Sequence, residues 1–211
     1  MINNIKWLGH STIKIITDKI IYIDPYNIKE NYNDADYIFI THSHYDHYSA
    51  IDINKCLKEE TKIIITSDLK DKANNLKIKK EHINVVIPNN NYKIDHLFFS
   101  TIPAYNTNKS FHPKENNWVG YIIEINNIKY YIAGDTDITN EAKNVKCDIA
   151  FLPIGGIYTM DYKEAAILTN TIKPKIVVPI HYGSIVGTIT DAINFKNSID
   201  EDIKCELLDK K

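Results

Sequence analysis

The segment 41–47 carries three histidines and an aspartate, and it directly follows an apolar run, residues 37–40, that predicts a buried strand. Divalent cations in proteins prefer several converging nitrogen and oxygen donors, so this cluster predicts a metal site. Two histidines two positions apart can point to one side at the end of a strand, and a tight turn can bring the other donors toward a second cation. A polar loop whose histidines only meet solvent explains this spacing poorly. The predicted ligands of this segment are His42, His44, Asp46 and His47.

Two further apolar runs end in a candidate ligand. Residues 130–134 precede Asp135, and residues 176–180 precede His181. Taken alone, the aspartate would more often be a turn or cap residue and the histidine a surface residue. The carboxyl ends of strands in open sheets are where ligands gather, however, and rigid strands preorganise a metal site. The shared position after strands therefore favours one rim for both residues and for the histidine cluster.

These motifs resemble a known family. The pattern His42-x-His44-x-Asp46-His47 is similar to the ligand signature of the metallo-β-lactamase fold superfamily. Over nearly the whole chain, further motifs resemble the small metal-dependent hydrolase branch that includes the ascorbate-6-phosphate lactonase-like proteins. The resemblance implies an α/β fold, a four-layer αββα sandwich, with a two-metal site at the ends of its strands. These further motifs lie at residues 7–11, 23–25, 133–136, 152–156 and 179–183.

The resemblance also implies how the ligands divide between the two cations. His42 and His44 are expected on the first cation, and Asp135 is expected to bridge both. The second cation is expected to bind Asp46, His47 and His181.

The sequence leaves the remaining ligand of the first cation open. Many relatives carry a histidine at or near the position that Asn106 holds here. The loop 104–114 contains one imidazole, His112, and we predict this residue as the ligand. Two alternatives stay open: Asn106 coordinates weakly, or the first site lacks one protein ligand. Either alternative would lower the affinity for that metal.

Two cations about 3.5–4 Å apart lower the pKa of a shared water to near neutrality and polarise a carbonyl or phosphoryl oxygen. Asp46 is the predicted catalytic residue that orients this water or accepts its proton. His10 is a second catalytic candidate, with a histidine that satisfies backbone groups at a strand turn as the alternative. Asp24 resembles the acidic residue that accepts the other N–H of a ligand histidine. Lys109 and Tyr158 are either contacts for an anionic substrate or ordinary loop residues.

The ligand types favour two zinc ions, with manganese or iron as alternatives, because the site is rich in imidazole and free of sulfur. We expect a metal-dependent hydrolase that acts on a small, anionic ester, lactone or phosphoester. The alternatives are a nucleic-acid phosphodiesterase and a non-catalytic metal- or ligand-binding protein of the same fold. Nucleic acid is an unfavoured partner because 25 basic and 27 acidic residues give a net charge of -2.

A chain of 211 residues predicts one domain, 1–211, with a sizeable core. The sequence shows no signal peptide and no apolar run of membrane-spanning length, so we expect a cytoplasmic protein without a membrane partner. The three cysteines are widely spaced and predict reduced thiols. The sequence leaves a homo-oligomer open.

Patterning predicts the elements that position these residues. Residues 5–8, 12–16 and 20–23 read as an antiparallel meander. A helix over 49–59 with Ser49 as its cap follows the ligand turn, and a second helix over 161–172 carries Asp161 and Glu164 as a capping box. Asn126 and Asn127 predict a hairpin. Further strands are expected at 62–66, 84–87, 97–102, 118–125, 128–133, 148–153, 175–180 and 203–207, and further helices at 68–74 and 190–198, with 84–87 assigned to the second half of the chain.

Overall fold

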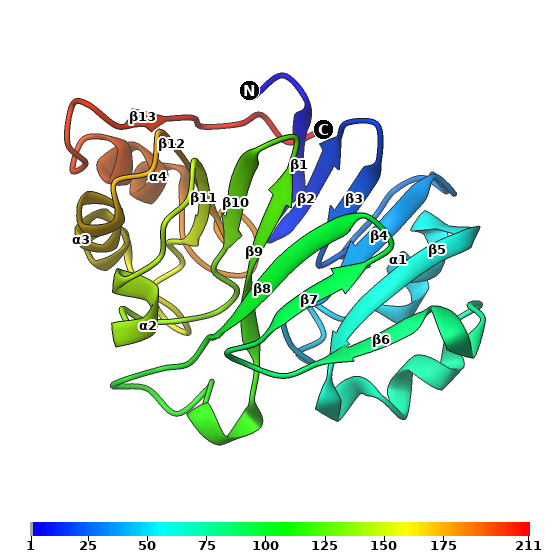
Figure 1. The fold of residues 1–211 in the computed structure, drawn as a ribbon. Helices are drawn as coiled ribbons and strands as arrows, with labels where there is room; N and C mark the ends of the chain where they lie inside the picture. Colours follow the sequence, from blue (N-terminus) through cyan, green and yellow to red (C-terminus); the bar gives the residue numbers. More distant parts are fainter. Residues whose placement is uncertain (1) are drawn as a thin grey trace. The chain divides into compact units, whose positions relative to one another are not determined.

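The computed structural model describes residues 2–211 and contains two β-sheets with a few helices, an α/β architecture as predicted (Figure 1). The chain divides into two compact units. The first unit runs to Val86 and includes Leu208–Lys211, and the second unit is Ile87–Leu207. Each unit holds one sheet. The single domain expected for residues 1–211 stays a prediction.

The sheet of the first unit is half antiparallel and half parallel. Its first three strands form the predicted antiparallel meander, and the other three continue the sheet in parallel (Figure 1). The parallel half places the carboxyl ends of neighbouring strands at the same edge. In sheet order the strands are β1 (Ile5–Gly9), β2 (Thr12–Ile16), β3 (Ile20–Ile23), β4 (Ala35–Phe39), β5 (Leu57–Thr66) and β6 (Ile83–Val86).

Helix α1 (Ala50–Cys56) begins shortly after the segment 41–47, which carries the predicted ligands and is called the ligand segment below. Ser49 caps the helix by accepting a hydrogen bond from the backbone of Asp52, as predicted. Ile53 and Cys56 of this helix are fully buried in the core of the first unit. The helix is shorter than expected because Leu57 already pairs with β4 as part of β5. β-Branched isoleucines dominate this core, in keeping with their preference for strands.

Two other predictions for the first unit are wrong. The strand expected at 84–87 in the second half is β6, which pairs with β5 in the first sheet. The helix expected at 68–74 is a pair of short 3-10 helices, η1 (Ser67–Leu69) and η2 (Lys72–Asn75), followed by η3 (Lys80–His82). In both places the apolar pattern is too short to fix the partner or the helix type. For β6, pairing with β5 decides which sheet the strand joins.

The sheet of the second unit is antiparallel at one end and parallel at the other. Asn126 and Asn127 form the predicted hairpin, with φ of 51° and 61°. Strand β7 was not predicted because its alternating side chains are mostly polar. In sheet order the strands are β13 (Lys204–Cys205), β12 (Ile176–Ile180), β11 (Ile149–Pro153), β10 (Ile128–Ile132), β9 (Val119–Ile125), β8 (Leu97–Pro103) and β7 (Asn91–Ile94).

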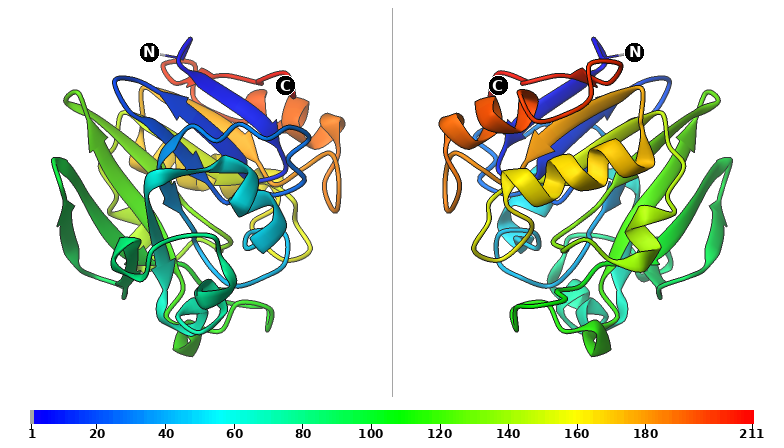
Figure 2. Two further views of the ribbon diagram at one scale, coloured as in Figure 1. Left: turned by 90° about the vertical axis from the view of Figure 1, so that its right-hand side faces the viewer. Right: turned by 90° about the vertical axis from the view of Figure 1, so that its left-hand side faces the viewer.

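Helices of the second unit accompany the parallel half of its sheet. Helix α3 (Tyr162–Ile172) carries the predicted capping box of Asp161 and Glu164. It packs against α4 (Ile189–Lys196), and the two lie side by side in both views (Figure 2). The short helix α2 (Asn140–Lys143) was not predicted, and η4 (Lys114–Asn116) precedes β9.

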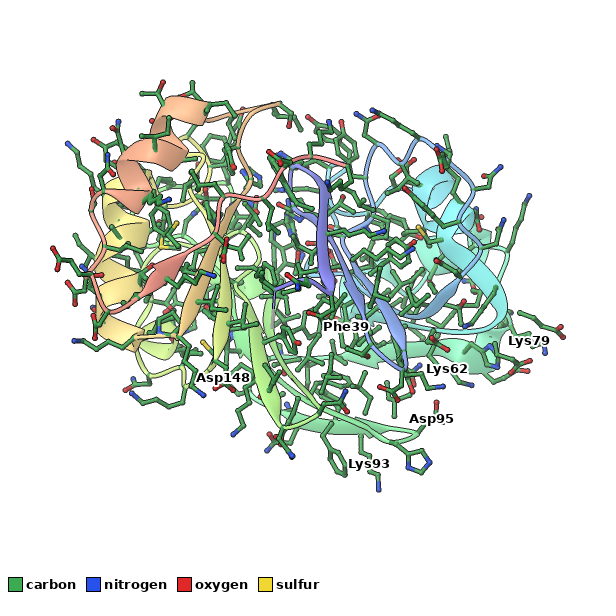
Figure 3. All side chains as sticks on the ribbon, turned by 90° about the horizontal axis from the view of Figure 1, so that it is seen from above. Phe39, Lys62, Lys79, Lys93, Asp95 and Asp148 are labelled. Atoms are coloured by element: carbon green, nitrogen blue, oxygen red, sulfur yellow. The ribbon has the colours of Figure 1, made fainter. Side chains whose placement is uncertain are left out.

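Most charged side chains lie at the periphery of each unit, and the buried core of each unit is mainly apolar. In Figure 3, Lys93 and Asp95 project from the β7–β8 hairpin of the second unit, and both are exposed. In the first unit, Lys79 is exposed, whereas Phe39 at the end of β4 is fully buried. Phe39 thus anchors the strand that leads into the ligand segment.

Candidate metal centre

The ends of β3 and β4 hold the ligand segment of the first unit in place. Because these strands are parallel, Asp24 and Thr41 leave the sheet side by side. The Asp24 carboxylate accepts hydrogen bonds from the backbone N–H of Thr41 at 2.8 Å and from its hydroxyl at 2.7 Å. Both residues are buried. The turn that carries the histidines is therefore tied to two neighbouring strands.

Asp24 also fixes the ring of His47. Its Oδ2 lies 2.7 Å from His47 Nδ1, and both side chains are buried. A carboxylate accepts, so Nδ1 donates and the lone pair of the neutral ring is at Nε2. Burial raises the pKa of the Asp24 carboxyl, while His47 and Thr41 act in the opposite direction. The contact predicted for Asp24 is confirmed, and it leaves Nε2 as the nitrogen of His47 that could bind a metal.

Thr41 orients His42 in the same way. Its hydroxyl donates to Asp24, so at 3.0 Å it accepts from His42 Nδ1. The lone pair of His42 is then also at Nε2. The ring of His42 lies 4.0 Å from that of His47 and 4.8 Å from that of His44, measured between centroids. Thr41 is not among the site residues predicted from the sequence, although its place directly before His42 was a usable signal.

Asp46 and His10 form a buried pair. Asp46 Oδ2 lies 2.8 Å from His10 Nε2 and 3.7 Å from His47 Nε2. Ligand atoms of His10, Asp46 and His47 all lie within 4.8 Å of one another. His10 occupies a turn with a φ of 50°, and its carbonyl accepts from the Trp7 indole. The imidazole of His10 therefore contacts the Asp46 carboxylate, and the catalytic role expected of His10 stays a prediction.

In the second unit, Asp135 and His181 follow two parallel strands, β10 and β12, that flank β11. His181 Nε2 lies 3.1 Å from Asp135 Oδ2. His112 Nε2 lies 3.3 Å from the same oxygen. All three side chains are nearly inaccessible to solvent. The three predicted ligands of this unit thus converge at one point.

The structure separates the roles of His112 and Asn106 in the loop between β8 and β9. His112 faces Asp135, as described above. Asn106 is occupied elsewhere: its Oδ1 accepts from the backbone N–H of His112 at 3.0 Å, and its Nδ2 donates to the carbonyl of Tyr158 at 2.9 Å. The imidazole of His112, rather than the amide of Asn106, is therefore the candidate metal ligand beside Asp135.

Lys109 and Tyr158 have structural contacts. Lys109 Nζ lies 2.6 Å from Asp137 Oδ1, and Asp137 also accepts from the backbone of Thr107 at 2.8 Å. The ring of Tyr158 packs edge-on against Phe111, with 4.7 Å between centroids. Asp137, which the sequence analysis missed, thus ties the His112 loop to the segment that carries Asp135.

The donor set suits a divalent cation of zinc type. Imidazole nitrogens and carboxylate oxygens, buried and already oriented, are the groups that such cations bind. The three cysteines are free thiols, and burial raises the pKa of each to about 12, which disfavours the thiolate form that binds metals.

Over residues 2–211, no helix has the length and hydropathy needed to cross a membrane.

Comparisons with known proteins identify the family of this chain. The model of the β-lactamase superfamily domain matches residues 4–181. A UPF0173 metal-dependent hydrolase of Thermococcus onnurineus is 32% identical, over 93% of this chain and 92% of the relative. Another from Pyrococcus horikoshii is 30% identical, over 97% of this chain and 95% of the relative.

Two solved structures are similar to this chain over nearly its whole length. A crystal structure described as a metal-dependent hydrolase of Parabacteroides distasonis is 27% identical, covers 98% of this chain and 92% of its own, and superposes with a TM-score of 0.80. Igni18, a metallo hydrolase of Ignicoccus hospitalis, is 24% identical over 98% of this chain and 94% of its own, with a TM-score of 0.75, and shares the fold. The chain therefore belongs to the β-lactamase superfamily, among the UPF0173 metal-dependent hydrolases.

Proposed function

We propose that this chain is a hydrolase that uses two divalent cations, which we take to be zinc ions. Asp135 is the proposed bridging ligand, and His112 completes the first site. The family to which the chain belongs supports this proposal, as do the buried imidazoles and carboxylates of each unit. The proposed ligands are His42, His44, Asp46 and His47 of the first unit and His112, Asp135 and His181 of the second.

The observation that carries the proposal is the convergence of two imidazoles on one oxygen of Asp135. His112 and His181 approach it at 3.3 and 3.1 Å in a site that solvent hardly reaches. Imidazole nitrogens and a carboxylate oxygen that converge in this way form a donor set that suits a divalent cation.

When bound, such cations supply an activated water and an electrophile for the substrate oxygen. The protein contributes the groups that hold and move protons. Asp46, paired with His10 at 2.8 Å, is the proposed acceptor of the proton that the water loses. His10 keeps the Asp46 carboxylate in one orientation. Asp24 and Thr41 hold His47 and His42 so that no rearrangement is needed during turnover.

The proposed substrates are small anionic esters, lactones or phosphoesters. The near balance of 25 basic and 27 acidic residues gives no net positive charge to attract a nucleic-acid backbone. A small substrate needs only the electrophilic site itself, which a charge-balanced protein can supply.

Hydrolysis assays on the metal-loaded protein test this function. We expect turnover of bis(4-nitrophenyl) phosphate or of a simple lactone that a chelator abolishes and added zinc or manganese restores. Asp135→Asn should lower kcat/KM by at least about 100-fold, since loss of a bridging ligand exceeds the effect of losing a supporting group. Asp71→Asn, at an exposed position, is the matched control. Turnover that resists chelation, or an unaffected Asp135→Asn variant, would contradict the proposal.

A further inference from the structure

The amide of Asn106 has only one orientation that satisfies its neighbours. On one side lies the carbonyl oxygen of Tyr158, which can only accept, 2.9 Å from Nδ2. On the other lies the backbone N–H of His112, which can only donate, 3.0 Å from Oδ1. A flipped amide would place two donors together and two acceptors together. The oxygen of Asn106 therefore faces His112.

This orientation decides the proton on the His112 ring. Asn106 Oδ1 also lies 3.2 Å from His112 Nδ1, and an amide oxygen can only accept. Nδ1 therefore carries the proton, and the lone pair of the neutral ring is at Nε2. That atom lies 3.3 Å from Asp135 Oδ2. A lone pair directed at a carboxylate oxygen is the arrangement expected of two ligands that share a cation.

We propose that Asn106 is a positioning residue that sets the tautomer and ring direction of His112, and is not itself a metal ligand. The proposal rests on the metal site of the proposed function. Asn106 is buried, and its backbone N–H also donates to the carbonyl of His112 at 2.8 Å. The side chain and the backbone thus close the loop between the two residues, and the donor that reaches Asp135 comes from this closed loop.

The chain orients two of its other proposed ligand histidines by the same means. Asp24 accepts from Nδ1 of His47, and Thr41 accepts from Nδ1 of His42. Asn106 gives His112 the equivalent acceptor, with a neutral amide in place of a carboxylate or hydroxyl. A supporting acceptor of this kind raises the basicity of the ligand nitrogen and fixes its direction.

The histidine tautomer can be measured directly in metal-free protein. Long-range 1H–15N correlation spectra of histidine-labelled protein at pH 8 distinguish the two tautomers, and the loss of one ring in His112→Gln assigns its signals. We expect the Nδ1–H form in the wild type and in Asn106→Asp, which keeps the acceptor oxygen toward His112 although it loses the donor to the Tyr158 carbonyl. Asn106→Leu, which removes this oxygen, should show the Nε2–H form or a mixture. Asn108→Leu, at an exposed position of the same loop, should match the wild type.

Metal affinity gives the second readout. Cobalt(II) titration of folded protein should show about 10- to 100-fold weaker binding for Asn106→Leu, with Asn106→Asp restoring most of the affinity. The inference is overturned if wild-type His112 is in the Nε2–H form, or if folded Asn106→Leu keeps the wild-type tautomer. A wild type that binds no cobalt would instead overturn the proposed function, because the tautomer is read without metal.

Discussion

At the scale of single residues, the site depends on the acceptors behind its imidazoles. His42, His47 and His112 each direct Nδ1 at an oxygen of the protein, at 3.0, 2.7 and 3.2 Å respectively. On each ring, Nε2 therefore points away from the oxygen that Nδ1 contacts. Because these side chains are already ordered, metal binding does not carry the free-energy cost of ordering them.

Asp24→Asn tests this arrangement in the first unit. An amide can offer His47 a donor where the carboxylate offered an acceptor, and it loses the charge that supports the imidazole. We expect metal affinity to fall by about 10- to 100-fold, measured by competition with a chromogenic chelator. Asp18→Asn, an exposed neighbour at the β2–β3 turn, should leave the affinity unchanged. Equal affinities for both variants would show that Asp24 does not support the ligands.

Part of the residue-level picture could be predicted from the sequence. Four ligand candidates lie within one short segment, and Asp24 lies after a neighbouring strand, so their types and spacing were informative. Thr41 and Asn106 were missed as supporting residues because each acts through a single contact whose geometry depends on a turn or loop. Asn106 and His112 are six positions apart in a loop, and no periodicity connects them.

At the scale of elements, the ends of strands and the turns after them place the ligands. The sequence predicted this for Asp135 and His181, which follow β10 and β12 as expected. It could not predict that β6 joins the first sheet or that β5 begins at Leu57, because strand pairing depends on distant partners. Helix α3 was predicted well because its amphipathic pattern and its capping box depend only on residues close together in the sequence.

Asp52 connects helix α1 to the loop after β3. It is 7% exposed, and it accepts from the backbone N–H groups of Asn27 and Ile28 and from Ser49 and Lys55. Burial alone would raise the pKa of Asp52, but the hydrogen bonds and Lys55 outweigh this, so the pKa is lowered. Its stabilising effect is therefore complete above the unfolded pKa of about 3.9 and is lost as the pH falls through the folded value.

Asp52→Asn should destabilise the protein by about 1–3 kcal/mol at pH 7, because buried partners lose a charged acceptor. Urea unfolding of the wild type and the variant at pH 7, 5 and 3 measures the difference, which we expect to shrink at pH 3. Glu59→Gln removes an exposed ion pair with Lys79 and should change little at any of these values. An Asp52→Asn difference independent of pH would contradict the assignment.

Gly155 gives His181 the space it needs. A Cβ at this position would lie 2.7 Å from the His181 carbonyl oxygen and 2.9 Å from its Nδ1. Gly155→Ala should therefore displace His181, lower stability by about 1–3 kcal/mol and weaken metal binding. Gly156→Ala, whose Cβ meets no atom nearer than 3.5 Å, bears only the strain of its φ of 84°. Calorimetric metal titration of both variants distinguishes the effects, and unchanged binding in Gly155→Ala would argue against this crowding.

At the scale of the whole molecule, each unit contributes a preorganised set of donors. The first unit supplies the histidine-rich turn, and the second supplies a buried carboxylate with two imidazoles beside it. Membership of the β-lactamase superfamily, whose relatives here are named metal-dependent hydrolases, is consistent with a metal-binding role for these donors. The substrate is not encoded in these ligands, since loops rather than ligands shape the pocket around such a centre.

The most direct test is the number of metal ions bound per chain, determined by inductively coupled plasma mass spectrometry on protein purified in the presence of zinc. The account predicts two ions per chain in the wild type, and fewer than two after replacement of the proposed bridging ligand in Asp135→Ala, with Asp71→Ala unchanged. Protein that is folded but retains no divalent metal, or an Asp135→Ala variant that still holds two ions, would contradict it.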